Sequence, residues 1–362
     1  MKLSLSNHHQ LLLNAIINPD ILIQYDSKEW ELVLRLARKV KLLGFLAVEL
    51  ERRKLMSTIP VRAVNQLRSS LIRVKKQQQL AFWELDRINW ALKSIQIPII
   101  VLKGVAYRLA ELPAAEGRFF VDLDILIPKG NLNQVEKILL KEGWKHREIS
   151  AYDEHYYRAW SHEIPALIHQ ERETEIDIHH TISPITSKIK IDSCLLIDAA
   201  ITTQSGHKIL NPTDMVLHCA VNLFQNNDLI DNLRDLLDLH DELQFFGRQD
   251  PVFWDKLIKR ANQLRLGRPL YYGIQYSRLI FQTAIPQNTE QRLMQKPSLI
   301  LQCIMQQLVP LALFPLHPDK ASKRAKFARF LLYIRSHWIR MPFYLLIPHL
   351  LYKTLLRFKS GK

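Results

Sequence analysis

An apolar run that carries two aspartates, Phe119 to Ile127, constrains the fold more than any other feature of the chain. Its aliphatic and aromatic residues predict a buried strand. Because side chains alternate along a strand, Asp122 and Asp124 would point to one side, with Cβ atoms roughly 6.5 Å apart. Two like charges this close to a core are costly unless they share a cation. The run therefore predicts a carboxylate pair that binds a hard divalent ion, Mg2+ or Mn2+.

The segment Glu175 to His179 offers a third carboxylate. It alternates as a strand does, which places Glu175, Asp177 and His179 on one face. If this strand lies beside the first, Asp177 completes a three-aspartate site, an arrangement that suits two-metal phosphoryl or nucleotidyl transfer. An ion pair between Asp177 and a lysine or arginine is the alternative. His179 is a candidate ligand for a metal or a phosphate, with a structural hydrogen bond as its alternative.

Basic residues near these strands suit a phosphate group. A β-branched run over Ile97 to Leu102 predicts a buried strand, and Lys103-Gly104 follows it just before a predicted helix. Backbone N–H groups at such a turn favour phosphate, and Lys103 adds a point charge. An ordinary strand-to-helix turn is the alternative. Arg118 is expected to neutralise phosphate or to pair with the carboxylates.

The hydrophobic pattern predicts an α+β fold in four regions. Helical spacing dominates residues 1–95, short strands alternate with helices over residues 96–211, and helical spacing returns over residues 212–298 and 299–362. The first region includes a long amphipathic helix from Pro60 to about Ser94 and shows no recognisable chemistry.

Individual elements of the central and later regions follow from the same pattern. Beyond the aspartate run, strands are expected over Trp144 to Ile149, His155 to Trp160, Ala166 to His169 and Glu173 to His179. Helices are expected over Val105 to Glu111, Asn131 to Glu142, Thr213 to Gln225, Asp228 to Phe246, Pro251 to Leu264 and Pro269 to Thr283. The carboxylates between Asp228 and Glu242 are expected to face solvent.

The formal net charge of +15 over 362 residues is placed unevenly. Residues Lys320 to Lys362 include eleven Lys or Arg and no Asp or Glu. Aromatic and aliphatic residues lie between these cations, and no window is apolar enough for a spanning helix. The tail therefore predicts peripheral contact with an anionic membrane, with nucleic acid as the less favoured partner and a docked structural helix pair as the alternative.

Cysteine content and the N-terminal sequence indicate the compartment. Three scattered cysteines without a CxxC pair disfavour a disulfide framework or a structural zinc site. The first twenty residues do not read as a signal peptide. A cytoplasmic protein is expected, with a peripheral position at the inner membrane face if the tail binds lipid.

The order of these motifs resembles a known family. Leu102-Lys103-Gly104, then Arg118-x-x-x-Asp122-x-Asp124, then Asp177-x-His179 is similar to the uncharacterised nucleotidyltransferase family, a bacterial branch of the polymerase-beta-like nucleotidyltransferase superfamily. His218 and the segment Leu233 to Asp238 extend the resemblance over roughly Ile97 to Asp238.

The resemblance implies a mixed-sheet nucleotidyltransferase core flanked by N-terminal and C-terminal helical regions. It also implies that Asp122, Asp124 and Asp177 bind divalent metal and carry catalysis. Lys103-Gly104 stands where the superfamily has its Gly-Ser turn, so a lysine occupies a position that normally contacts the triphosphate.

Together these features predict a metal-dependent nucleotidyltransferase. It would move a nucleoside monophosphate from an NTP, with ATP as the expected donor, to an unknown hydroxyl or phosphate acceptor and release pyrophosphate. Lys103, Gly104 and Arg118 would bind the nucleotide, and the helices of residues 212–298 would recognise the acceptor. The alternative is a non-catalytic adaptor that binds an anionic membrane or nucleic acid through its basic tail.

Overall fold

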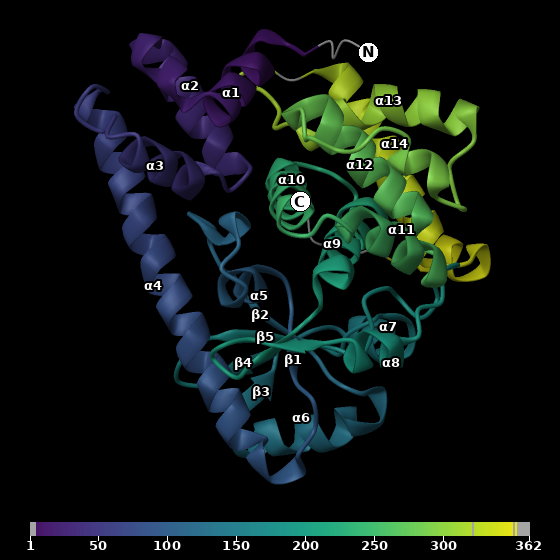
Figure 1. Cartoon of the computed structure of the whole chain (residues 1–362). Helices are drawn as coiled ribbons and strands as arrows, with labels where there is room; N and C mark the ends of the chain where they lie inside the picture. Colours follow the sequence, from purple (N-terminus) through teal and green to yellow (C-terminus); the bar gives the residue numbers. More distant parts are fainter. Residues whose placement is uncertain (1–4, 321, 350–351, 353–362) are drawn as a thin grey trace.

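The N-terminal region is a group of helices that ends in one very long helix (Figure 1). The structure, a computed structural model, describes residues 5–320, 322–349 and 352. The helices are α1 (Asn7–Ile17), η1 (Pro19–Gln24), α2 (Ser27–Lys39), α3 (Leu43–Arg52) and α4 (Val61–Ala91). Lys41 separates α2 from α3, because its left-handed backbone, with φ of 59°, cannot continue a helix. The long helix expected after Pro60 is confirmed as α4.

A seven-stranded mixed sheet forms the centre of the described chain. Its strands are β1 (Ile100–Val101), β2 (Leu123–Leu126), β3 (Trp144–His146), β4 (Leu167–His169), β5 (Glu175–His179), β6 (Ile201–Thr202) and β7 (Lys208–Ile209). Their spatial order is β3-β4-β5-β2-β1-β7-β6. β2 is parallel to β5 and antiparallel to β1, so the aspartate strand is central and paired on both sides. The mixed sheet with its flanking helices confirms the predicted α+β fold class.

Short helices connect the strands and cover the sheet. They are η2 (Lys93–Ile95), α5 (Lys103–Leu109), η3 (Pro113–Ala115), η4 (Lys129–Asn131), α6 (Leu132–Lys141), α7 (Ala151–Trp160) and α8 (Ser193–Asp198). Figure 1 shows α6 below the sheet and the later helices α9 and α10 above it, while α4 runs along its side and contacts β2, α5 and α6. All four residues of β2 are buried, as a strand enclosed on both faces requires.

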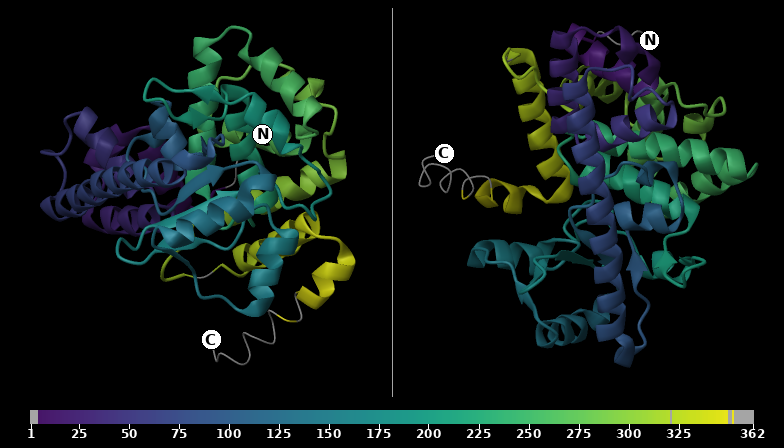
Figure 2. Two further views of the ribbon diagram at one scale, coloured as in Figure 1. Left: turned by 90° about the horizontal axis from the view of Figure 1, so that it is seen from below. Right: turned by 90° about the vertical axis from the view of Figure 1, so that its left-hand side faces the viewer.

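A second helical layer follows the sheet. It consists of α9 (Pro212–Val221), the π-helix η5 (Asn222–Asn226), α10 (Leu233–Gln249), α11 (Phe253–Gln263), α12 (Gly267–Phe281), η6 (Thr289–Arg292), α13 (Leu299–Leu313) and α14 (Lys323–Arg340). Figure 2 shows α14 at the periphery of the molecule. The layer reaches back to the N-terminus, because His9 Nε2 lies 3.1 Å from the carbonyl oxygen of Pro315 and Arg35 pairs with Asp319.

One expected element is wrong, and another begins later than expected. The segment His155 to Trp160, expected as a strand, is part of helix α7. Ser150 caps this helix by accepting a hydrogen bond from the backbone of Asp153, and its aromatic residues recur at helical spacing. Helix α10 begins at Leu233 rather than at Asp228, because Leu229 and Asp231 both adopt left-handed backbone.

The strands around the aspartates are shorter than expected, and β5 lies beside β2, which is the condition for a three-aspartate site. Residues 119–122 lead into β2 without belonging to it, and β1 spans two residues of the expected Ile97 to Leu102. The boundaries of the four predicted regions stay a prediction. Residues 321, 350–351 and 353–362 of the basic tail lie outside the described residues.

Candidate active site

Three aspartates converge at the centre of the sheet. Asp124 and Asp177 are direct partners in the parallel β2–β5 pair, and Asp122 lies one residue before β2 on the same side as Asp124. One carboxylate oxygen from each lies within 4.8 Å of the other two. The convergence predicted from strand alternation is therefore present, while the chemical roles of the three residues stay a prediction.

The electrostatics of this cluster suit a cation. Burial raises the pKa of Asp122, and the charge of Asp124 raises it further. Burial likewise raises the pKa of Asp177, with Asp124, Glu163 and Asp122 adding to the rise. Each shift means that the ionised carboxylate is disfavoured by its surroundings. Three converging carboxylates that repel one another are a donor set that fits a hard divalent ion such as Mg2+ or Mn2+.

Lys103 supplies positive charge at the edge of this cluster. Its Nζ donates a hydrogen bond to Oδ1 of Asp124 at 2.5 Å. Burial alone would lower the pKa of Lys103, but the charges of Asp124, Glu163 and Asp122 outweigh burial and raise it. Lys103 adopts a left-handed backbone, with φ of 50°, at the start of α5. For a residue other than glycine this is an unfavourable conformation of the kind found at functional sites.

Gly104 is required by close packing rather than by its backbone angles. A Cβ atom at this position would lie 2.9 Å from Cδ1 of Phe120 and 3.0 Å from Nε of Arg118. Only glycine allows the start of α5 to approach these two side chains so closely. The Lys103-Gly104 turn therefore lies against the segment that leads into β2.

Arg118 faces α10 rather than the three aspartates. Its guanidinium forms an ion pair with Asp238, lies 3.8 Å from Asp235, and stacks 5.5 Å from the ring centre of Tyr107. Asp238 also accepts from Arg234 at 2.8 Å, so one carboxylate holds two arginines. Asp238 is only 1% exposed, so the prediction that the acidic residues of this helix face solvent is wrong here.

Two residues at the site were missed in the sequence. His162 and Glu163 follow α7, and Glu163 forms an isolated bridge with His179. Nε2 of His179 lies 2.9 Å from Oδ1 of Asp124 and 3.5 Å from Oε2 of Glu163. No local pattern marks this pair, because its position depends on a contact between distant segments.

His162, Glu163 and His179 form a second group that could hold a metal ion, with ligand atoms within 4.8 Å of one another. Burial lowers the pKa of both histidines well below the usual range, so both are neutral near pH 7. His179 makes a hydrogen bond to Asp124, which is the structural role expected as the alternative to metal or phosphate binding. This hydrogen bond helps to hold the Asp124 carboxylate in position.

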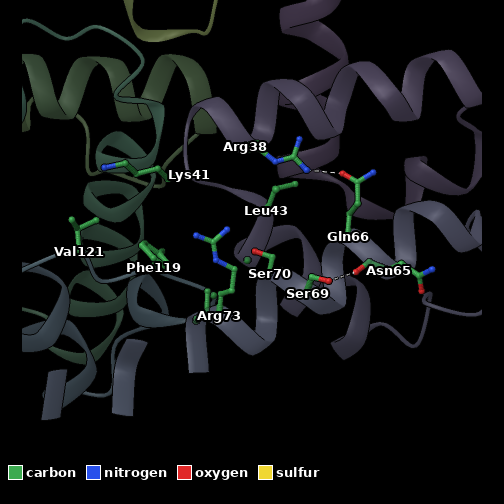
Figure 3. A pocket seen from close by; sticks show the side chains of 13 residues that line it. Arg38, Lys41, Leu43, Asn65, Gln66, Ser69, Ser70, Arg73, Phe119 and Val121 are labelled. Atoms are coloured by element: carbon green, nitrogen blue, oxygen red, sulfur yellow. Dashed lines mark hydrogen bonds between the residues drawn. The ribbon is translucent and has the colours of Figure 1, made fainter. Parts of the chain in front are cut away.

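Two pockets adjoin the aspartates. The smaller, of about 160 Å³, contains Asp122, Asp124, Lys103 and Gly104 and is bounded by Arg234 and Asp235 of α10. The larger, of about 490 Å³, lies between the N-terminal helices and the segment before β2 (Figure 3). Both pockets include Lys41, Phe119 and Val121. The two spaces therefore meet beside the carboxylates.

The larger pocket is basic and polar. Arg38, Lys41 and Arg73 line it, together with two serines and two side-chain amides, and no Asp or Glu is among its described lining residues. Nη2 of Arg38 donates to Oε1 of Gln66 at 2.6 Å. In Figure 3 the Lys41 side chain extends above Phe119 and Val121, away from Arg38. The N-terminal region, in which the sequence showed no chemistry, thus contributes cations next to the candidate site.

A comparison with known families decides the wider relationship. The sequence model of the uncharacterised nucleotidyltransferase family matches residues 26–282. The chain belongs to this family. The matched region begins at the cap of α2, ends just after α12, and contains the whole sheet with every candidate residue. No curated protein matches the chain.

Membership in the uncharacterised nucleotidyltransferase family makes the chain a transferase of nucleotidyl groups, which confirms the predicted enzyme class. It also implies a nucleotide substrate. The acidic cluster on β2 and β5 is compatible with the divalent metal that such chemistry uses. Of the described residues, no helix is long and apolar enough to cross a membrane.

Proposed function

We propose that the protein transfers a nucleoside monophosphate from an NTP, with ATP as the expected donor, to a hydroxyl or phosphate acceptor. The acceptor oxygen forms a bond to the α-phosphorus, the bond from that phosphorus to its bridging oxygen breaks, and pyrophosphate leaves. The observation that carries the proposal is the convergence of Asp122, Asp124 and Asp177, with carboxylate oxygens within 4.8 Å of one another, in a nucleotidyltransferase-family chain.

Each aspartate has a proposed role. Asp122 and Asp124 would hold Mg2+ or Mn2+, and Asp177 would share in metal binding while it orients or deprotonates the acceptor hydroxyl. When bound, the divalent ions supply positive charge to the reacting phosphate. The hydrogen bond from His179 to Asp124 supports this assignment, because it fixes the carboxylate in place.

Lys103 has a proposed double role. In the absence of metal its ammonium offsets the charge of Asp124, at 2.5 Å. In the loaded site the ammonium turns to the triphosphate, while the backbone at Gly104 approaches a phosphate oxygen. Arg118, held by Asp238 at the wall of the small pocket, offsets negative charge that develops on the phosphates.

We expect the part of the nucleotide that extends beyond the Lys103-Gly104 turn to bind in the basic pocket. Cations stabilise phosphate oxygens, and three cationic side chains line this pocket: Arg38 on α2, Lys41 in the turn after it, and Arg73 on α4. Lys41 also acts on the carboxylates, since its charge lowers the pKa of Asp122 against the larger effect of burial. With the nucleotide bound there, the wall of the smaller pocket that Arg234 and Asp235 of α10 form would contact the acceptor. Acceptor recognition is the role predicted for the helices of residues 212–298.

The test is transfer of label from the α-phosphate. Purified protein is incubated with each α-labelled NTP, Mn2+ or Mg2+, and a deproteinised cell extract as the source of acceptors. Labelled product and pyrophosphate are expected with the wild type and with Asp198→Asn, whose carboxylate is exposed on α8. Asp122→Asn and Asp177→Asn should each lose at least about a hundredfold in rate. Equal transfer by these two variants, or none by the wild type with any NTP, refutes the proposal.

A second candidate function is favoured by one observation on α14. Phe327 and Phe330 of this helix are 62% and 57% exposed and lie one helical turn apart. Cations without any acidic residue surround them in the sequence from Lys320 onward. We propose that this face rests on an anionic membrane surface, because exposed aromatic side chains among cations match the headgroup boundary.

Flotation of the full chain on vesicles tests the membrane contact. Binding is expected to vesicles rich in anionic lipid at low salt, and to fall when Phe327 and Phe330 are both changed to Ser. Ile72→Ser is the matched control, because Ile72 is 69% exposed and belongs to α4 rather than to α14. Absence of flotation at low salt refutes the membrane contact. Tight binding to duplex nucleic acid instead would assign the basic tail to that partner.

A further inference from the structure

A cavity of about 920 Å³ lies among the C-terminal helices. It shares no lining residue with the pocket that contains the aspartates. Its walls come from α12, α13, α14, the π-helix η5 and the segment after β5. Its volume is in the range of small-molecule sites, about 300–1,000 Å³. The cavity is thus large enough for a ligand of its own.

Positive charge gathers in this cavity. Lys188, Arg265, Arg268 and Arg335 line it, and no Asp or Glu is among the lining residues in the described part of the chain. Burial lowers the pKa of Arg335, and the charge of Arg268 lowers it further, although two tyrosines act in the opposite sense. Arg268 and Arg335 repel each other, and the described lining residues offer them no carboxylate, so a bound anion would stabilise both.

The remaining wall is aromatic and aliphatic. The guanidinium of Arg335 lies 5.5 Å from the ring centre of Tyr272 and donates at 3.0 Å to the carbonyl oxygen of Phe224. The Lys188 ammonium lies 5.4 Å from the ring of Trp338. Cations and rings therefore alternate around one space, which suits a ligand that is charged at one end and apolar along its body.

Two further features distinguish this cavity from an accidental void. Oε1 of Gln295 is buried and has no hydrogen-bond partner among the described residues, although the Gln295 side chain lines the cavity. Buried polar atoms are almost always satisfied, so the partner of this oxygen is expected to come from a ligand or water. Phe224 and Gln225 belong to a π-helix, an uncommon element that is frequent at functional sites.

We infer that this cavity is a second ligand site, which binds an amphipathic anion with a phosphate or carboxylate head and an apolar body. The head lies among Arg265, Arg268 and Arg335, and the body lies against Leu301, Trp338 and Ile339, which are accessible from the cavity. The inference does not depend on nucleotidyl transfer, because the cavity and the aspartate pocket have separate walls. It also differs from membrane docking, since it requires a discrete molecule inside the fold.

Calorimetry on the full chain tests this site without metal or NTP. The probes are decyl phosphate, decanoate, decanol and inorganic phosphate, the two amphiphiles being kept below their micelle-forming concentrations. Saturable binding is expected for decyl phosphate or decanoate, and the stronger of the two identifies the head group. Equal binding of decanol refutes the role of the cations. Equal binding of inorganic phosphate refutes the role of the apolar wall.

Variants locate the binding. Arg265 and Arg268 are exposed at the junction of α11 and α12, so their replacement leaves the core intact. Arg268→Gln is expected to weaken the amphiphile about tenfold, and Arg265→Gln with Arg268→Gln to weaken it further. Arg62→Gln removes the same charge from an exposed position on α4 and should change nothing. Unchanged affinity in the double variant, with a native circular dichroism spectrum, overturns the inference.

Discussion

Replacing Lys103 by methionine tests whether the Lys103 ammonium neutralises Asp124 when no metal is bound. Lys103 pairs with Asp124 at 2.5 Å, where Asp124 is 3% exposed and the lysine side chain 24%. Removing one partner of a buried ion pair costs about 3–5 kcal/mol. Because a quarter of Lys103 is exposed and His179 still donates to Asp124, we expect Lys103→Met to lower the free energy of unfolding by about 2 kcal/mol.

The assay is urea denaturation with chelator and again with saturating Mn2+. Because a divalent ion would neutralise the same carboxylates, the stability difference between wild type and variant should fall below about 1 kcal/mol when Mn2+ is present. Lys137→Met is the control, because Lys137 is exposed on α6 and its loss should cost no more than about 0.5 kcal/mol. A variant as stable as wild type in chelator, or a difference that Mn2+ leaves unchanged, would refute the reasoning.

Three further predictions concern groups around the site. Burial raises the pKa of Glu242 to about 8, so the stability that its protonated form contributes is lost as pH rises through that value. Between about pH 5 and pH 8, the free energy of unfolding of the wild type, measured by urea titration, should fall by on the order of 3 kcal/mol relative to that of Glu242→Gln. Asp238→Asn leaves Arg118 and Arg234 without their shared counter-charge and should cost about 3 kcal/mol in the same assay. Gly104→Ala places a Cβ 3.0 Å from Nε of Arg118 and should cost about 1–3 kcal/mol, measured by thermal unfolding.

The aspartate site was predictable because its geometry follows from alternation. Period-two spacing places Asp122 with Asp124, and the same spacing places Asp177 on one face of β5. The one non-local assumption, that the two strands are neighbours, is met by the Asp124–Asp177 register. The family match, over residues 26–282, covers all three aspartates.

Other features depend on contacts that no local pattern encodes. The aromatic residues of His155 to Trp160 gave this segment a strand-like composition, yet the Ser150 cap and the four-residue spacing of Tyr156 and Trp160 favour a helix. His162 and Glu163 enter the site only through the bridge to His179.

The acidic residues of α10 show the same limit. Asp238 and Glu242 are buried because neighbouring helices enclose the face that carries them. Their charge alone would place them in solvent, which is why the sequence predicted exposure. The pairing of Arg118 with Asp238 follows from the same packing, since these residues are 120 positions apart in the chain.

Divalent-metal binding to the three aspartates is the central claim, and calorimetric titration with Mn2+ and Mg2+ tests it most directly. We predict that the wild type and Asp198→Asn bind the ion with equal affinity. Asp122→Asn and Asp177→Asn, both folded by circular dichroism, should each bind at least about tenfold more weakly. Absence of binding by the wild type, or equal binding by all four proteins, would contradict the account.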